Sequence, residues 1–327
     1  MRVAIIGGGV AGSTLAYLLS KKANHEVTIF DINEKYVKPC GDIVPNIYTP
    51  PFNWEVKFNI KRFSFRIDGE RIYDVEYSHT KWLVIDKWNW INSMRKHAKI
   101  VVSHEALKEK FDYVIDSRGP YPLDRQVVYT TRAIIETKSF DDKAVIEFNT
   151  KYTGFYWIFP SGENEYNVGA GFLEYKNSKS LLNEYLRERF KDYRIKDVRG
   201  APISIGIPSI KKGRVGEARG LVFPLSGEGI RPSAISAEYA FEAIHKGKEL
   251  DDYLDDKLKI FEKRINIQLM LLNIYKYSSI SLRRTLMKTF FKNDVLIDAY
   301  LEDKIDLDGI VESIKSVKGN GYISREF

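Results

Sequence analysis

The feature that most constrains this chain is a glycine-rich turn between an apolar run and a helical pattern at the N-terminus. Residues 2–6 are typical of a buried parallel strand, and helical spacing continues to about residue 22. Gly7, Gly9 and Gly12 fit the spacing G-x-G-x-x-G. In this motif the first glycine permits the tight turn, the second lets a phosphate approach the backbone, and the third lets the helix pack on the strand. The pattern predicts a dinucleotide-binding unit whose helix N-terminus faces a pyrophosphate.

The segment after the helix supports a nucleotide ligand. A second short strand, residues 27–30, ends on Asp31. A carboxylate at this strand end can accept hydrogen bonds from both ribose hydroxyls of an adenosine. A purely structural βαβ unit without a ligand is the alternative, and this unit alone does not distinguish NAD from FAD.

Cysteine and charge content exclude several classes of protein. The single cysteine, Cys40, allows neither a disulfide within the chain nor the dithiol of a disulfide-reducing flavoprotein, and it cannot form a cysteine-cluster zinc site. The five histidines fall in no motif, so no metal site and no histidine acid or base is predicted. The net charge of +7 is spread along the chain, which favours acidic partners or an anionic membrane surface over nucleic acid.

The N-terminus shows no signal peptide, and no apolar stretch approaches the roughly 18 to 20 residues that cross a bilayer. We therefore expect a cytoplasmic protein, with peripheral membrane contact as the alternative.

Strand and helix patterns alternate along the rest of the chain. Residues 52–77 alternate apolar and polar side chains around the turn Asp68-Gly69, and a period of about two returns over residues 126–171. Helical spacing is found at residues 88–97 and 181–190, in an alanine-rich stretch after Pro232, and beyond about Leu250. The layout predicts a nucleotide-binding domain assembled from separated segments, with β-rich insertions.

Five further segments carry motifs that distinguish the cofactor. They are Lys38–Asp42 (KPCGD), Tyr113–Gly119 (YVIDSRG), Phe155–Pro160 (FYWIFP), Asn167–Gly171 (NVGAG) and Gly216–Ile230, which contains GEA and PLSGEGI. Together with the glycine-rich turn, they resemble the geranylgeranyl reductase family of FAD-dependent oxidoreductases, in the aromatic-hydroxylase-like flavoprotein superfamily, and most closely a short archaeal-type member. The resemblance implies FAD as cofactor and hydride transfer to C=C bonds of an isoprenoid lipid or prenyl diphosphate.

The resemblance also implies an α/β fold. We expect a discontinuous Rossmann-like FAD-binding domain of the GR2 type, an inserted antiparallel β-sheet substrate domain and a C-terminal helical segment. The expected bounds are 1–50, 80–120 and 200–250 for the FAD-binding domain, 51–79 and 121–199 for the substrate domain, and 251–327 for the helical segment.

The last of the five segments is similar to the family's second FAD motif. Gly227 and Gly229 would let backbone N–H groups approach the flavin pyrimidine edge, and the helix that follows would stabilise negative charge at flavin N1. Glu217 would hydrogen-bond a ribityl hydroxyl; it stands where the family usually has Asp, and Arg219 stands where a small residue is usual. The resemblance extends cofactor binding to Gly7, Gly9, Ala11, Gly12, Asp31, Cys40, Gly41, Asp42, Lys87, Gly119, Glu228 and Ile230.

An aromatic strand supplies the predicted substrate site. Phe155, Trp157 and Phe159 would share one strand face, where they could wall a channel for an isoprenoid chain and stabilise a developing carbocation. An ordinary aromatic core is the alternative. The resemblance adds Gly169 and Gly171 to the substrate-binding set. The catalytic candidates are Cys40, Tyr156 and Trp157, with Cys40, Tyr156 and bound water as possible proton donors.

The source of electrons is less defined. No second G-x-G-x-x-G is present, so electrons are expected from transiently bound NAD(P)H, a quinone, or a small acidic carrier such as ferredoxin, to which the +7 charge is complementary. Two other functional classes stay open: a flavin-dependent monooxygenase or halogenase, and a non-catalytic flavin-binding electron-transfer protein.

Overall fold

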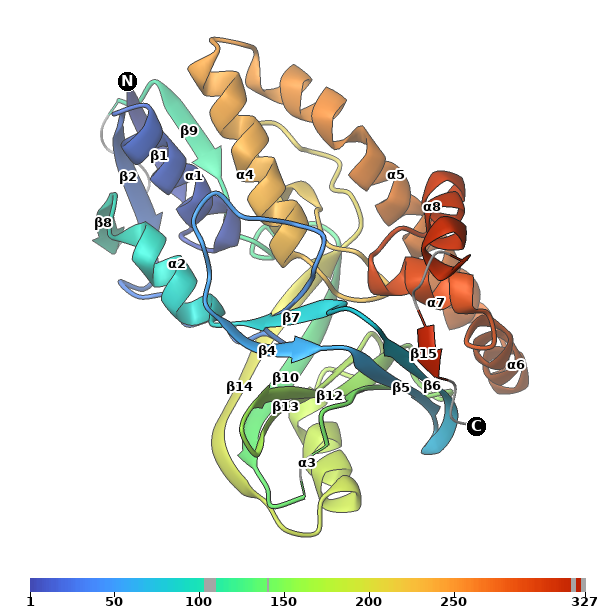
Figure 1. Ribbon diagram of the computed structural model, residues 1–327. Coiled ribbons are helices and arrows are strands. Elements are labelled where there is room, and N and C mark those ends of the chain that lie inside the picture. Colours follow the sequence, from blue (N-terminus) through green and yellow to red (C-terminus); the bar gives the residue numbers. More distant parts are fainter. Residues whose placement is uncertain (103–109, 140, 319–321, 325–327) are drawn as a thin grey trace.

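The computed structural model describes residues 1–102, 110–139, 141–318 and 322–324. A four-stranded parallel sheet with the order β8-β2-β1-β9 contains the N-terminus (Figure 1). Its strands are β1 (Arg2–Ile6), β2 (Glu26–Asp31), β8 (Lys99–Val102) and β9 (Tyr113–Asp116). Helix α1 (Val10–Lys22) joins β1 to β2, as the glycine-rich turn predicts.

Small side chains lie between the parallel sheet and the helices that cover it. Helix α4 (Ile230–His245) lies beside α1 (Figure 1), and buries the alanine face that its sequence indicates. Ala237, Ala240 and Ala243 are fully buried in one core with Val3, Ile5, Leu15 and Ile29. Alanine has little volume, so the helix backbones can approach closely.

A second sheet of eight strands forms the lower part of the molecule in Figure 1, with the order β14-β10-β13-β12-β11-β5-β6-β15. Its strands are β5 (Arg62–Ile67), β6 (Glu70–Tyr77), β10 (Gln126–Glu136), β11 (Ala144–Phe148), β12 (Gly154–Gly162), β13 (Glu165–Phe172), β14 (Arg194–Ile205) and β15 (Tyr322–Ser324). Pairing is antiparallel except between β11 and β5, which run parallel. Helix α3 (Ser178–Arg189) packs on β10 and β13.

Three short strands connect the two sheets. They are β3 (Ile43–Pro45), β4 (Val56–Ile60) and β7 (Trp82–Ile85), with β7 in the centre. Helix α2 (Lys87–Arg95) follows β7 and begins at Asp86, whose carboxylate accepts a hydrogen bond from the Asn89 backbone N–H.

The C-terminal part is mostly helical, with α5 (Leu250–Tyr277), α6 (Ile280–Phe290), α7 (Asp294–Leu301) and α8 (Leu307–Lys318). One expectation was wrong: Tyr322–Ser324 form β15, which adds to the edge of β6, so the chain is not helical throughout beyond residue 250. Helix α5 runs from the parallel sheet towards the large sheet (Figure 1), where Tyr275 Oη donates to the Asn149 carbonyl over 3.1 Å. None of the helices in the described ranges is both long and apolar enough to cross a bilayer.

Candidate functional site

A cavity of about 1300 Å³ lies where the sheets and the C-terminal helices meet. Its wall combines the glycine-rich turn, the loop at residues 35–41, one face of β12, residues 224–230, and parts of α5, α6 and α7. Pockets for drug-sized ligands usually measure about 300 to 1,000 Å³. The cavity therefore has room for a large cofactor and a second molecule.

The three motif glycines have different surroundings. Gly7 has φ +97°, and a Cβ there would lie 2.7 Å from the Ser117 carbonyl oxygen. Gly9 lines the cavity, and its Cβ direction meets no atom within 4 Å. Gly12 lies outside the lining, and its Cβ would come within 2.1 Å of the Gly7 carbonyl oxygen. The first and third glycines therefore allow the chain to fold here, while Gly9 leaves space open to a ligand.

Asp31 lines the cavity and is held by an arginine that the motif did not reveal. Its Oδ2 atom accepts hydrogen bonds from the Gly8 backbone N–H and from Arg95 Nη1, each over 2.7 Å. Arg95 is almost fully buried and also donates to the carbonyls of Gly8, Asn33 and Glu34. A lone arginine in a helical pattern usually indicates a solvated face, so the sequence offered no signal for this role.

The second FAD motif brings another helix N-terminus to the cavity. Gly227 has φ +72° with open space at its Cβ, and Gly229 precedes the first turn of α4. Gly227, Glu228, Gly229 and Ile230 all line the cavity. Gly9 gives α1 no side-chain cap, so the backbone N–H groups at the start of α1 can bind an anionic group such as the pyrophosphate of FAD. At the start of α4 the Arg231 N–H donates to Glu228 Oε1 over 2.7 Å and Pro232 has no N–H, so the glycines of this segment offer the flavin ring a wall of backbone atoms.

Glu217 lies in a short 3₁₀ turn, η1 (Gly216–Arg219), that borders the cavity. Its Oε1 atom accepts from the Ser204 N–H over 2.8 Å, and Oε2 accepts from Lys38 Nζ over 2.9 Å. A Cβ on Gly119, which also lines the cavity, would lie 3.2 Å from Glu217 Oε2. The Glu217 side chain, which is longer than the Asp usual in the family, is thus anchored at the cavity wall through both carboxylate oxygens.

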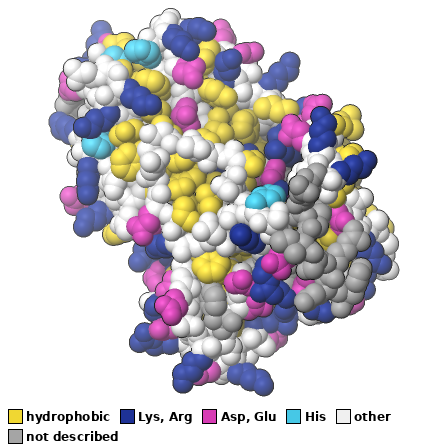
Figure 2. Space-filling model, in the orientation of Figure 1, with side chains coloured by type: hydrophobic (Ala, Val, Ile, Leu, Met, Phe, Trp, Pro, Cys, Tyr) yellow, Lys and Arg dark blue, Asp and Glu magenta, His cyan; other side chains and the backbone are white. Residues whose placement is uncertain are grey.

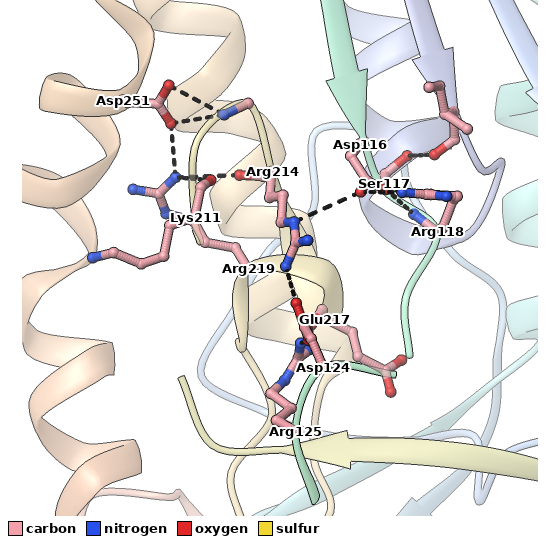
Figure 3. Close-up of polar contacts among 12 residues, drawn as sticks. Asp116, Ser117, Arg118, Asp124, Arg125, Lys211, Arg214, Glu217, Arg219 and Asp251 are labelled. Atoms are coloured by element: carbon pink, nitrogen blue, oxygen red, sulfur yellow. Dashed lines mark hydrogen bonds and ion pairs between the residues drawn. The ribbon is translucent and has the colours of Figure 1, made fainter. Parts of the chain in front are cut away.

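Arg219 does not line the cavity, although Glu217 of the same motif does. It is fully buried and points towards α5, where Nη1 lies 3.1 Å from Asp251 Oδ1 (Figure 3). In the same view Arg214 joins Asp124 to Asp116 at the end of β9. The unusual arginine therefore ties the motif to the C-terminal helices and leaves the cavity unobstructed.

The loop that contains Cys40 is pinned to the large sheet. The carbonyl oxygen of half-buried Cys40 accepts a hydrogen bond of 2.8 Å from Asn167 Nδ2, and Asn167 Oδ1 accepts one of 3.0 Å from Trp157 Nε1. Gly41 packs on Phe159, whose ring would lie 3.2 Å from an added Cβ. Cys40 and Gly41 line the cavity, and the buried Asn167 is a bridging residue that the sequence did not single out.

Asp42 lies behind the cavity wall, outside the lining that was expected to contain it. It has φ +57°, and its Oδ1 atom lies 3.3 Å from Lys87 Nζ. Lys87 is buried and does line the cavity. Burial acts to lower the pKa of Lys87, but the neighbouring Cys40, Tyr36 and Asp42 outweigh it and raise the pKa. Lys87 is therefore a buried cation in the wall, and Asp42 is its counter-ion.

The aromatic face of β12 forms the opposite wall. Phe155, Trp157 and Phe159 all line the cavity, and the Trp157 and Phe159 rings stack with centroids 6.2 Å apart. Gly169 lies beneath Trp157, whose ring would be 1.9 Å from an added Cβ; Gly169 makes room for the indole and is not itself in the lining. Gly171 is in the lining.

Tyr156 was expected to face the reaction and does not. It points to the other side of β12, where it stacks on Tyr185 with ring centroids 4.2 Å apart and packs on Phe172. Side chains alternate along a strand, so a residue between Phe155 and Trp157 must face the opposite layer. Burial also raises the pKa of Tyr156 to about 12. Tyr156 belongs to the core under α3.

The aromatic wall continues into an apolar arm built by the C-terminal helices. Leu271 and Ile274 of α5 and Leu286, Met287 and Phe290 of α6 line this arm. Ile274 and Leu286 are also 51% and 38% exposed, so solvent reaches this arm. No motif marks these residues, because their apolar spacing is that of any packed helix.

Comparison with known proteins supports both halves of the site. Residues 127–206 match the geranylgeranyl reductase catalytic domain, and residues 5–38 match an NAD(P)-binding Rossmann-like domain. The digeranylgeranylglycerophospholipid reductase of Methanocaldococcus jannaschii is 25% identical over 80% of this chain and 81% of its own length. That of Thermoplasma acidophilum is 30% identical over 51% of this chain and 46% of its own length.

Solved structures support the fold. A geranylgeranyl bacteriochlorophyll reductase-like protein from Thermoplasma acidophilum has a TM-score of 0.75 at 16% identity, covering 96% of this chain and 95% of its own. A flavin-dependent halogenase has a TM-score of 0.64 at 14% identity, over 97% and 77% of the two chains.

The cofactor motifs, the cavity that they line and these relatives agree. The chain therefore carries a geranylgeranyl reductase catalytic domain beside a Rossmann-like FAD-binding domain, and it is an FAD-dependent oxidoreductase related to the archaeal digeranylgeranylglycerophospholipid reductases.

Proposed function

We propose that this protein reduces C=C bonds in the isoprenoid chains of lipids, with geranylgeranyl chains on a glycerophospholipid or a prenyl diphosphate as the substrate class. The observation that carries this proposal is the apolar arm between the aromatic wall and the exposed side chains of Ile274 and Leu286. Such a shape suits a long hydrocarbon chain better than a compact polar substrate. The name of the Methanocaldococcus jannaschii relative supports the same class.

Each wall of the cavity has a role in this proposal. Bound FAD, once reduced, supplies a hydride. Gly9 and Gly229 would hold the cofactor through backbone N–H groups, and Gly227, whose N–H donates to the Phe223 carbonyl, would let the flavin approach the backbone. Phe155, Trp157 and Phe159 would hold the alkene and exclude water, and their ring faces would stabilise positive charge on carbon. Cys40, at the edge of this wall, would act as a packing group or a proton donor.

An anaerobic single-turnover experiment tests the function. Photoreduced holoenzyme should be reoxidised by a geranylgeranyl glycerophospholipid without oxygen, and mass spectrometry should find two hydrogens added per double bond. Flavin reoxidation that requires oxygen, with an oxygenated product, would identify a monooxygenase instead. A reduced flavin that no prenyl lipid reoxidises would reject the reductase proposal.

Electrons would arrive from a small acidic carrier such as ferredoxin, or from NAD(P)H bound transiently. Figure 2 shows Lys and Arg side chains scattered over the face in view, between acidic ones, so a carrier would meet a diffuse positive field. The rate of flavin reduction by ferredoxin should fall as ionic strength rises, whereas reduction by NAD(P)H should change much less.

The open end of the apolar arm would face an anionic lipid bilayer. Met270, Ile274 and Tyr277 are exposed along one side of the last turns of α5, and Leu282 and Leu286 are exposed on α6. Lys276 and Lys292 lie beside these apolar side chains in the sequence, and Lys276 Nζ lies 5.3 Å from the centroid of the Tyr277 ring. Exposed apolar side chains flanked by cations suit the headgroup region of such a bilayer.

Vesicle sedimentation tests this surface. The protein should pellet with vesicles that contain phosphatidylglycerol, and Leu282→Glu should weaken pelleting about tenfold, because a charge enters the apolar contact. Val311→Glu, at an exposed apolar side chain of α8, is the matched control and should leave pelleting unchanged. Equal loss in both variants, or no pelleting of the wild type, would reject this surface.

A further inference from the structure

A buried charge cluster joins the turn after α7 to the first turn of α4. It consists of Asp303, Glu228 and Arg231, whose side chains are 3%, 7% and 6% exposed. Asp303 and Glu228 line the cavity, whereas Arg231 lies behind them. Two carboxyl groups thus border the cavity at the N-terminus of α4, next to the second FAD motif.

One carboxylate oxygen of the cluster, Glu228 Oε2, has an ion-pair partner but no hydrogen bond in the part of the chain that the structure describes: Arg231 Nε lies 3.5 Å away. Asp303 Oδ1 accepts from Ser226 Oγ over 2.6 Å, and Glu228 Oε1 accepts from the Arg231 backbone N–H over 2.7 Å. Arg231 Nη2 lies 3.7 Å from Asp303 Oδ2 and donates instead to the Glu302 carbonyl over 3.1 Å. Within the described residues, buried Glu228 Oε2 has no hydrogen-bond partner.

The neighbouring groups do not compensate the second negative charge. Lys304 binds Glu302 and Glu312, and Lys81 binds Asp298 and Glu302. The other facing groups are neutral: Tyr300 of α7, whose pKa burial raises, and the Gln268 amide of α5, whose Oε1 accepts from the Leu225 N–H. Two carboxylates and one guanidinium would leave a net buried charge, which a carboxyl group avoids by keeping a proton.

Proton affinities agree with this charge count. Burial, then the charge of Glu228, raise the pKa of Asp303 to about 7. Burial also raises the pKa of Glu228, against the opposing effect of Arg231. The two groups interact, so the proton belongs to the pair.

We propose that Asp303 and Glu228 share one proton at neutral pH and supply it to the cavity as the proton source of alkene reduction. This rests on the proposed function. Saturation of one C=C bond consumes a hydride, which ends on one carbon, and a proton, which ends on the other. The pair gives up its proton and becomes doubly ionised, with Arg231 as its remaining counter-charge, and water then reprotonates it.

Infrared titration of the ligand-free protein tests the shared proton without any activity. The wild type should show the C=O stretch of a buried neutral carboxylic acid at pH 6, which disappears by pH 9. Asp303→Asn and Glu228→Gln should each remove or shift that band. Asp298→Asn is the matched control, because Asp298 is buried against Lys81 and lies outside the cavity lining; it should keep the band. A wild type without this band at pH 6 would overturn the shared proton.

Single-turnover oxidation of the photoreduced protein by a prenyl lipid tests whether the shared proton is used in alkene reduction. The wild-type rate should fall as pH rises through 7, whereas Asp303→Asn should lower the rate at pH 6 about 100-fold, within the range of general acids, and flatten the pH profile. FAD affinity, measured by flavin fluorescence, should change less than threefold. Wild-type rates and pH profile in Asp303→Asn and Glu228→Gln would overturn the proton source. If the wild type reduces no prenyl lipid, the proposed function fails, and the infrared titration still decides the pair.

Discussion

The two ends of the cavity are built in different ways. At the nucleotide end, backbone atoms of two glycine-rich segments line the wall, and each segment starts a helix directly after a turn. At the apolar end, side chains of β12, α5 and α6 meet, although β12 ends at Gly162 and α5 begins only at Leu250. Cofactor binding therefore depends on short continuous motifs, while the substrate end depends on how distant elements pack.

Substitution of Arg95 should cause the largest loss of stability at the nucleotide end of the cavity. Arg95→Leu removes the partner of Asp31 and leaves three backbone carbonyls without their donor. Removing one member of a buried ion pair costs about 3 to 5 kcal/mol. Urea unfolding of the apoprotein should show a loss of this size. A loss below about 1 kcal/mol would mean that water replaces the guanidinium easily.

Two glycines of one motif should separate folding from binding. Gly9→Ala adds a methyl group to open space, so apoprotein stability should change by less than about 1 kcal/mol while FAD affinity falls at least tenfold. Gly12→Ala places its methyl group against the Gly7 carbonyl, so the apoprotein itself should lose stability. Urea unfolding and flavin fluorescence titration measure both effects. Equal FAD affinity in Gly9→Ala and the wild type would contradict the role given to the open space.

The same contrast explains how far the sequence predicts the molecule. The βαβ unit, the alanine-faced helix and the aromatic strand are local patterns, and each forms where expected. Arg95, Asn167 and Asp303 escaped prediction because their partners lie far away in the chain. The prediction for Tyr156 was wrong because alternate residues of a strand face opposite sides, so Tyr156 cannot share the cavity face of Phe155 and Trp157. Asp42 is adjacent in sequence to lining residues, but its backbone turns it away.

The stability of the apoprotein should depend on pH through Asp303. Its folded-state pKa, about 7, exceeds an unfolded value of roughly 4, so the folded protein holds the extra proton and loses stability as pH rises from about 4 to 7. Asp303→Asn cannot ionise, so relative to the wild type it should gain about 2 to 3 kcal/mol between pH 5 and pH 8. Urea unfolding at both pH values checks this. A constant difference between the two proteins would show that the pKa of Asp303 is unshifted.

A conservative substitution at the apolar end should weaken substrate binding more than FAD binding. Trp157→Phe keeps an aromatic ring but loses the hydrogen bond to Asn167 Oδ1 and leaves part of the space above Gly169 empty. We expect KM for a prenyl lipid to rise several-fold, equivalent to about 1 kcal/mol. FAD affinity should stay within twofold. A parallel loss of FAD affinity would show that the indole supports the flavin more than the lipid.

Tyr156→Phe should have the smallest effect. Its ring contacts with Tyr185 and Phe172 both survive in phenylalanine, and its hydroxyl forms no hydrogen bond within the described residues. Stability should change by less than about 0.5 kcal/mol, and turnover should stay within twofold of the wild type. Phe155→Leu, at the adjacent residue that does line the cavity, is the comparison and should lower turnover more. If Tyr156→Phe slowed turnover tenfold while Phe155→Leu did not, the face of β12 assigned to the substrate would be the wrong one, since alternate residues of a strand cannot share a face.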